Sequence, residues 1–278
     1  MKIDAHHHFW HYNAVEYGWI DDAKSSIRRD FLPPDLEAAM EQAGIDGAIS
    51  VQARQTVAET QWLLACADRC DSIRGVVGWA PLIDPDAGEI LAQMAQNQKL
   101  RSIRQVLHDE ADPLYMLRDD FNRGIRALKP LGLAYDILIF EHHLPQSIEF
   151  VDRHPDQLFI IDHLAKPRVR DREISPWRDH LRELARRPNV YCKLSGLATE
   201  ADYSNWTPEQ LLPYIEIVLD AFSPARTMFG SDWPVCLLAI DYRRWAELVA
   251  SAIERLSESE RERIWSGTAI EAYMLGMP

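Results

Sequence analysis

Eight short apolar runs, each followed by a segment of helical periodicity, are the feature that most constrains the fold of this 278-residue chain. Turn residues bound each run, which is typical of strands. Regular alternation of strands and helices indicates a parallel sheet, and eight units in about 260 residues favour a closed (β/α)₈ (TIM) barrel over an open doubly wound sheet. The predicted strands lie at residues 2–9, 47–53, 73–80, 100–106, 134–140, 157–165, 189–197 and 227–235.

The segments between the runs contain residues that are typical of helix starts. They show no sign of a second domain. Thr207-Pro208, with Glu209 in the first turn, is typical of a helix start, and Ser175-Pro176 marks another. No Gly/Ser linker, low-complexity tract or shift in composition divides the chain, so residues 1–278 are interpreted as one domain. The predicted helices lie at 34–43, 56–70, 87–96, 118–129, 146–154, 176–186, 208–222 and 242–256. Extra C-terminal helices over 257–273 are expected to pack on the barrel wall.

Charge and composition exclude several classes of partner. The formal net charge of −13 argues against nucleic acid and anionic membranes, which are bound by lysine and arginine stripes. The sequence has no signal peptide and no apolar segment of transmembrane length, and four cysteines are too few for a disulfide framework, so a cytoplasmic location is expected. A homo-oligomer is left open, because apolar patches on barrel helices serve either as core or as interface.

Polar residues near the carboxyl ends of three predicted strands suggest the site. His6 and His8 share one face of the first strand, whereas His7 faces the surrounding helices. His163 ends the sixth strand and Asp232 the eighth. Active sites of barrels form at this end, so the four side chains are expected to converge on one mouth. Three imidazoles and a carboxylate suit a mononuclear metal-assisted hydrolase, or a general acid/base site without metal.

Six further residues are candidates for binding substrate. Arg104 lies among apolar neighbours, where an unpaired guanidinium is costly, so it either contacts substrate or forms a structural ion pair. Trp10 offers an aromatic face to a sugar ring, with packing under a loop as the alternative. The remaining candidates, weaker than Arg104, are Gln52, Arg54, Lys166 and His142.

The ordered set of strand-end motifs resembles the lactonase branch of the amidohydrolase superfamily, whose members include hydrolases of L-fuconolactone and L-rhamnonolactone and relatives that open 2-pyrone-4,6-dicarboxylate. The similarity spans the whole chain. Its motifs are "IDAHHHFW", "VQAR", "IRQVLHDE", "IDHLAKP", "VYCKLSGL" and "MFGSDWPV".

The resemblance implies a hydrolase that opens a sugar lactone to its acid. Asp232 is expected to take a proton from the attacking water and return it to the leaving ring oxygen, while a site of His6, His8 and His163 polarises the carbonyl. One divalent metal ion held by these histidines and Asp232, with zinc expected, fits the pattern. The seventh strand offers no histidine, so a two-metal site is not expected. Some relatives are thought to work without metal, which leaves its requirement open.

Three other functions stay open from the sequence. A lactonase for a carboxylated pyrone or muconolactone would need several arginines in the mouth, and the strand ends supply only Arg54 and Arg104. A metal-dependent decarboxylase of the same superfamily would share the barrel and the first-strand pair. A non-catalytic metal-binding barrel is the third alternative, and Asp232 argues against it because storage needs no general base.

Overall fold

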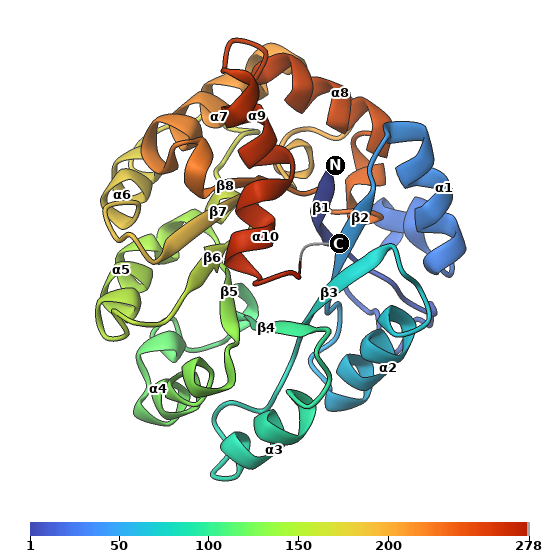
Figure 1. Ribbon diagram of the computed structural model, residues 1–278. Helices are drawn as coiled ribbons and strands as arrows, with labels where there is room; N and C mark the ends of the chain where they lie inside the picture. Colours follow the sequence, from blue (N-terminus) through green and yellow to red (C-terminus); the bar gives the residue numbers. More distant parts are fainter. Residues whose placement is uncertain (277–278) are drawn as a thin grey trace.

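Eight parallel strands form the centre of the molecule, as the alternation predicts. The computed structural model describes residues 1–276, and its single sheet runs in the order β1 to β8. Helices form an outer ring around the strands (Figure 1), which confirms the (β/α)₈ barrel. The strands are β1 (Ile3–His7), β2 (Gly47–Val51), β3 (Ile73–Gly78), β4 (Leu100–Val106), β5 (Ala134–Leu138), β6 (Phe159–Ile161), β7 (Val190–Leu194) and β8 (Thr227–Phe229).

The eight predicted barrel helices are all present, and several begin at side-chain caps. The Thr56 side chain accepts the Glu59 N–H at the start of α2, and Asp241 accepts the Arg244 N–H at the start of α8. The helices are α1 (Pro33–Ala43), α2 (Val57–Ala67), α3 (Ala87–Met94), α4 (Asp119–Arg126), α5 (Leu144–Asp152), α6 (Trp177–Leu184), α7 (Pro208–Phe222), α8 (Tyr242–Ala252), α9 (Glu258–Glu262) and α10 (Thr268–Ala272). Within residues 1–276, no helix is both long and apolar enough to cross a bilayer.

The sheet closes where the segment after β8 meets β1. The Asp232 N–H donates to the His6 carbonyl at 2.8 Å, and the His8 N–H donates to the Trp233 carbonyl at 2.6 Å. Closure therefore involves the same stretch of backbone that carries the candidate site residues of both strands.

The C-terminal helix does more than pack on the barrel wall. Ala272, Tyr273 and Leu275 join the apolar cluster formed by inward-facing residues such as Val77 and Ile160, and α10 crosses the end of the barrel in Figure 1. The Tyr273 hydroxyl reaches into the barrel and donates to Asp136 Oδ2 at 2.6 Å. This segment closes the amino-terminal end of the barrel, so the opposite end is left for a binding site.

Candidate active site

A β-bulge in β1 aims its histidines into the barrel. The pairing register with β2 shifts between Asp4 and His7. Ala5 packs in the inner apolar cluster, yet the next residue, His6, also faces the barrel interior, where it contacts Lys193. Strict alternation would have turned His6 away, so the extra residue of the bulge restores it to the mouth. His8 follows on the same side.

His7 points the other way, as expected. Its Nε2 lies 3.0 Å from the Ser50 hydroxyl, and its ring contacts Phe9 and Trp233 of the outer core. This histidine belongs to the packing between the barrel wall and the surrounding segments.

His163 reaches the mouth through a left-handed turn, because β6 ends at Ile161, four residues before the predicted boundary of 165. His163, Leu164, Ala165 and Lys166 all have positive φ, between 47° and 57°. Non-glycine residues in this region cost roughly 1–2 kcal/mol each, so the rest of the fold must hold the turn. The Leu164 carbonyl accepts the buried Trp177 indole N–H at 2.7 Å, which is one such restraint. Strain of this kind is typical of functional sites.

The position of Asp232 depends on Asp4, a buried aspartate that was not predicted as a site residue. Asp4 accepts the Ser231 N–H at 2.8 Å, the Ser231 hydroxyl at 2.6 Å and the Tyr242 hydroxyl at 2.8 Å. These bonds fix the segment just before Asp232, whose φ of 59° turns its carboxylate toward the histidines. Asp4 lies in the motif that carries His6 and His8, but a one-residue bulge leaves no signal in a periodicity analysis.

The donor atoms of His6, His8 and Asp232 are spaced for one metal ion. His6 Nε2 lies 3.2 Å from His8 Nε2 and 3.8 Å from Asp232 Oδ1, and His8 Nε2 lies 3.5 Å from Asp232 Oδ1. A tetrahedral zinc ion with ligands at about 2.0–2.2 Å separates its donors by roughly 3.3–3.6 Å. His163 Nε2, 3.8 Å from Asp232 Oδ1, borders the same group. The residues therefore fit a mononuclear divalent-metal site.

Protonation states also suit metal binding or proton transfer. His8 Nδ1 lies 2.8 Å from the Val51 carbonyl, which can only accept, so Nδ1 donates to it and the ring is oriented with Nε2 toward Asp232. Burial lowers the pKa of His163 to about 4 and that of His6 well below its ordinary value, so both are neutral near pH 7. Burial alone would raise the pKa of Asp232, but His163, His8 and Lys166 hold it below its ordinary value, and the carboxylate stays ionised.

Behind His6, two cations and two carboxylates fill the barrel interior. Lys193 Nζ lies 2.5 Å from Asp136 Oδ2, 2.9 Å from Asp162 Oδ1 and 3.1 Å from His6 Nδ1. Arg104 Nη1 donates to Asp162 Oδ2 at 2.9 Å. All four charged side chains are at most 4 % exposed, and their charges balance. The Lys193 ammonium also occupies the space between His6 and Asp162, which argues against a second ion there.

A cavity of about 400 Å³ opens above this cluster at the carboxyl end of the strands. Small-molecule sites commonly measure about 300–1,000 Å³. Five of the predicted site residues line it, namely His8, Arg104, His163, Lys166 and Asp232. Lys166 forms an ion pair with Glu200 across the cavity wall.

Four predicted binding residues do not line this cavity. The Gln52 amide donates to the Arg104 carbonyl at 3.2 Å and so contacts Arg104 instead. Arg54 pairs with Glu16 at 2.7 Å. Trp10 is fully buried, with its indole N–H donating to the Arg29 carbonyl at 2.8 Å, and the His142 side chain is 63 % exposed beside Glu141. The packing alternative for Trp10 is therefore the one observed.

Loop residues supply part of the cavity lining. Trp19 and Lys24 come from the segment after β1, and Tyr203 comes from the segment after β7. His108, just after β4, stacks on Phe140 with ring centroids 4.5 Å apart, and both line the cavity. His108 lies in the motif "IRQVLHDE", which indicated a possible substrate contact. For Trp19 and Lys24, only the long connection between β1 and α1 could have indicated such a contribution, since long loops often carry function.

Comparison with known proteins agrees with this architecture. The chain is 43 % identical to an L-fucono-1,5-lactonase of Burkholderia multivorans and 36 % identical to one of Burkholderia ambifaria, in each case over 100 % of this chain and 97 % of the relative. A crystal structure of an amidohydrolase from Burkholderia multivorans with bound zinc superposes with a TM-score of 0.96 at 42 % identity, covering 99 % of this chain and all of that one. The Amidohydrolase family model matches residues 3–275. The chain belongs to the amidohydrolase family.

Proposed function

We propose that this protein hydrolyses a neutral sugar lactone of the L-fucono-1,5-lactone type to the sugar acid. The observation that carries the proposal is the Asp232 carboxylate, which lies 3.5 Å from His8 Nε2 and 3.8 Å from His163 Nε2 at the base of a small-molecule cavity. Full-length similarity to two L-fucono-1,5-lactonases supports the substrate class.

Asp232 has the position and charge of the general base. It accepts a proton from the attacking water as the water adds to the lactone carbonyl, and it returns that proton to the ring oxygen as the C–O bond breaks. Arg104 and His163 border the space where the carbonyl oxygen gains negative charge, and they would act as donors to it.

His6, His8 and Asp232 would hold one zinc ion, and His163 lies beside these donors. Such an ion supplies a Lewis acid that stabilises negative charge on the carbonyl oxygen. The bond from His8 Nδ1 to Val51 keeps the ring oriented with Nε2 toward Asp232 whether or not an ion is bound.

The charges lining the cavity favour a neutral substrate over a dicarboxylate. Each of the three cations, Lys24, Arg104 and Lys166, is already paired with a carboxylate, respectively Asp21, Asp162 and Glu200. The acids lining the cavity, Asp109, Glu200 and Asp232, also number three. A pyrone dicarboxylate would bring two more negative charges, and among the described lining residues no cationic side chain without a carboxylate partner is left to meet them, so a bound metal ion would have to balance both.

The test of function is acid release from a panel of lactones. With L-fucono-1,5-lactone, a pH-indicator assay should show enzyme-dependent acid production, because the site couples a base to a cavity without excess charge. With 2-pyrone-4,6-dicarboxylate, the same assay should stay at the background rate. Release only from the pyrone would reject the neutral substrate, and no release from any lactone would reject lactone hydrolysis.

Metal binding is tested separately from turnover. Protein stripped with a chelator and then given zinc should retain one ion per chain after gel filtration, as measured by elemental analysis. His8→Ala removes one of three converging donors and should retain no more zinc than the stripped sample. His11→Ala is the matched control, because the His11 side chain is 64 % exposed and pairs with Asp30 outside the cluster. Equal zinc in both variants would contradict the assigned donors.

A further inference from the structure

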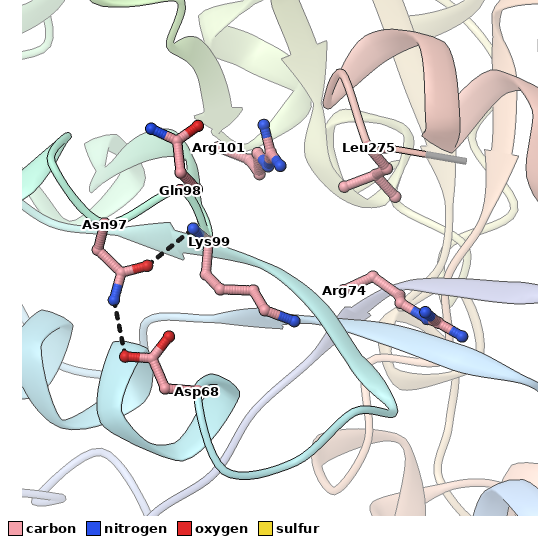
Figure 2. Close-up of a pocket in the computed structure, with 8 residues that line it drawn as sticks. Asp68, Arg74, Asn97, Gln98, Lys99, Arg101 and Leu275 are labelled. Carbon is pink, nitrogen blue, oxygen red and sulfur yellow. Dashed lines mark hydrogen bonds between the residues drawn. The ribbon is translucent and has the colours of Figure 1, made fainter. Parts of the chain in front are cut away.

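A second cavity, of about 490 Å³, lies at the opposite end of the barrel from the proposed active site. Arg74 and Arg101 are each the second residue of their strands, β3 and β4, and Lys99 immediately precedes β4. Figure 2 shows these side chains around the cavity, with Leu275 of the C-terminal segment facing them. Because the strands are parallel, these positions belong to the amino-terminal end, beside α10.

Three basic side chains line this cavity. Among residues 1–276, no carboxylate lies within 4.0 Å of the charged nitrogens of Arg74, Lys99 or Arg101. Asp68, which also lines the cavity, accepts instead from the Asn97 amide at 2.9 Å. Burial lowers the pKa of Arg101. Three half-buried positive charges thus share one cavity in a protein of net charge −13.

Two of the arginines also carry buried donors that find no acceptor. Arg74 Nε and Arg101 Nε are both buried, and neither has a hydrogen-bond partner in the described part of the chain. An unsatisfied buried donor costs about 1–3 kcal/mol, and native proteins commonly resolve such groups with an ion or ordered water.

Two glycines on neighbouring strands leave room for the stems of Arg74 and Arg101 to lie against the sheet. A Cβ at Gly47 would lie 2.9 Å from both Cγ and Nε of Arg74, and a Cβ at Gly75 would lie 2.8 Å from Cγ of Arg101. Each arginine therefore lies flat on the backbone of a strand that has no side chain at that point. This packing keeps the guanidinium groups beside the cavity instead of extended into solvent.

We propose that this cavity is a binding site for a small phosphate-bearing molecule. Arg74, Lys99 and Arg101 all line this cavity, and Lys99 Nζ also donates to the Ile73 carbonyl at 2.6 Å. A phosphate dianion offers several oxygens to such donors, whereas a carboxylate offers only two oxygens in one plane. The amides of Asn97 and Gln98 and the apolar Leu275 side chain give the remaining volume a mixed lining suited to an organic group. The site is independent of the proposed lactonase activity, because the inner apolar cluster and the charged layer separate it from the mouth.

Calorimetric titration with inorganic phosphate tests the proposal on the intact chain. Phosphate should bind at one site per chain, and Arg101→Gln and Arg74→Gln should each weaken it by about 10–100-fold, the value of a charge-assisted hydrogen bond. Arg244→Gln is the matched control: the Arg244 side chain is 74 % exposed on α8, and its loss should leave phosphate affinity unchanged. Circular dichroism and lactone turnover should be unaltered in all three variants.

Three results would overturn the proposal. The first is the absence of phosphate binding above that of chloride at equal ionic strength. The second is an equal loss of affinity in Arg244→Gln and Arg101→Gln, which would indicate a general charge effect. The third is tighter binding of succinate than of phosphate, which would assign the cavity to dicarboxylates. If Arg101→Gln fails to fold, Arg74→Gln, on the neighbouring strand, supplies the same comparison.

Discussion

Asp232→Asn is expected to reduce lactone turnover by about 10²–10⁴-fold, the usual contribution of a positioned acid or base. The amide cannot accept a proton from water near neutral pH. The fold should survive, because asparagine tolerates positive φ as aspartate does and the backbone N–H bond to His6 is unaffected. Initial rates with L-fucono-1,5-lactone and a thermal denaturation curve measure the two effects.

Asp109→Asn is the matched control for that experiment. Asp109 also lines the cavity, but its side chain is 71 % exposed, so its replacement should change turnover little. Since Asp232 is also a candidate metal donor, zinc content is measured on the same samples, and lost turnover at unchanged zinc content assigns the effect to proton transfer. Near-normal turnover in Asp232→Asn would reject its role as the base.

The pH dependence follows from the same carboxylate. The base must be ionised to act, and its pKa is held below the ordinary value, so protonation begins only at a lower pH than for an ordinary aspartate. The rate should therefore stay level from neutral to mildly acidic pH and fall only below the usual carboxyl range. A rate that halves near pH 6 would assign the base to another group.

Much of the fold was predictable because each β/α unit carries its own local signals. The predicted bounds of β4, residues 100–106, match the observed strand. β6 and β8 are shorter than predicted, because the chain leaves the strand through turns in which His163 and Asp232 have positive φ. Nothing in the residue types of "DHLAKP" announces four consecutive left-handed residues, which are imposed by tertiary packing.

The site was predictable to the extent that it depends on strand parity. His6 and His8 share one side of β1, and His163 and Asp232 follow β6 and β8 at the same end of the barrel. The bulge in β1 and the left-handed turns at His163 and Asp232, which bring the four together, were not predicted. The interior charges were harder to predict, because pairing between Asp136, Asp162 and Lys193 depends on the register of three neighbouring strands, β5, β6 and β7. Lys193 lies in the buried run "VYCKLSGL". A buried charge there predicts an acidic partner, but the sequence does not identify which residue it is.

Lys193→Met should have the largest effect on stability, a loss of about 3–5 kcal/mol in the free energy of unfolding, as when one partner of a buried ion pair is removed. Methionine nearly matches the lysine stem in volume, so the effect is one of charge. With Lys193 gone, Arg104 alone would face the carboxylates of Asp136 and Asp162, both fully buried. Urea denaturation of wild type and variant measures the difference.

Two further variants separate charge imbalance from lost packing. Lys129→Met removes an exposed pair with Asp156, whose side chains are 58 % and 79 % exposed, and should change stability by well under 1 kcal/mol. The double variant Lys193→Met with Asp136→Asn restores a balanced interior of Arg104 and Asp162, while Ser102 and Tyr273 still offer hydroxyls at position 136. It should recover part of the lost stability. If the double variant is as unstable as Lys193→Met, the interior charges are not what holds this layer together. Recovery would mean that the fold is stable only when the buried charges beneath His6 balance, so the position of His6 in the site depends on that balance.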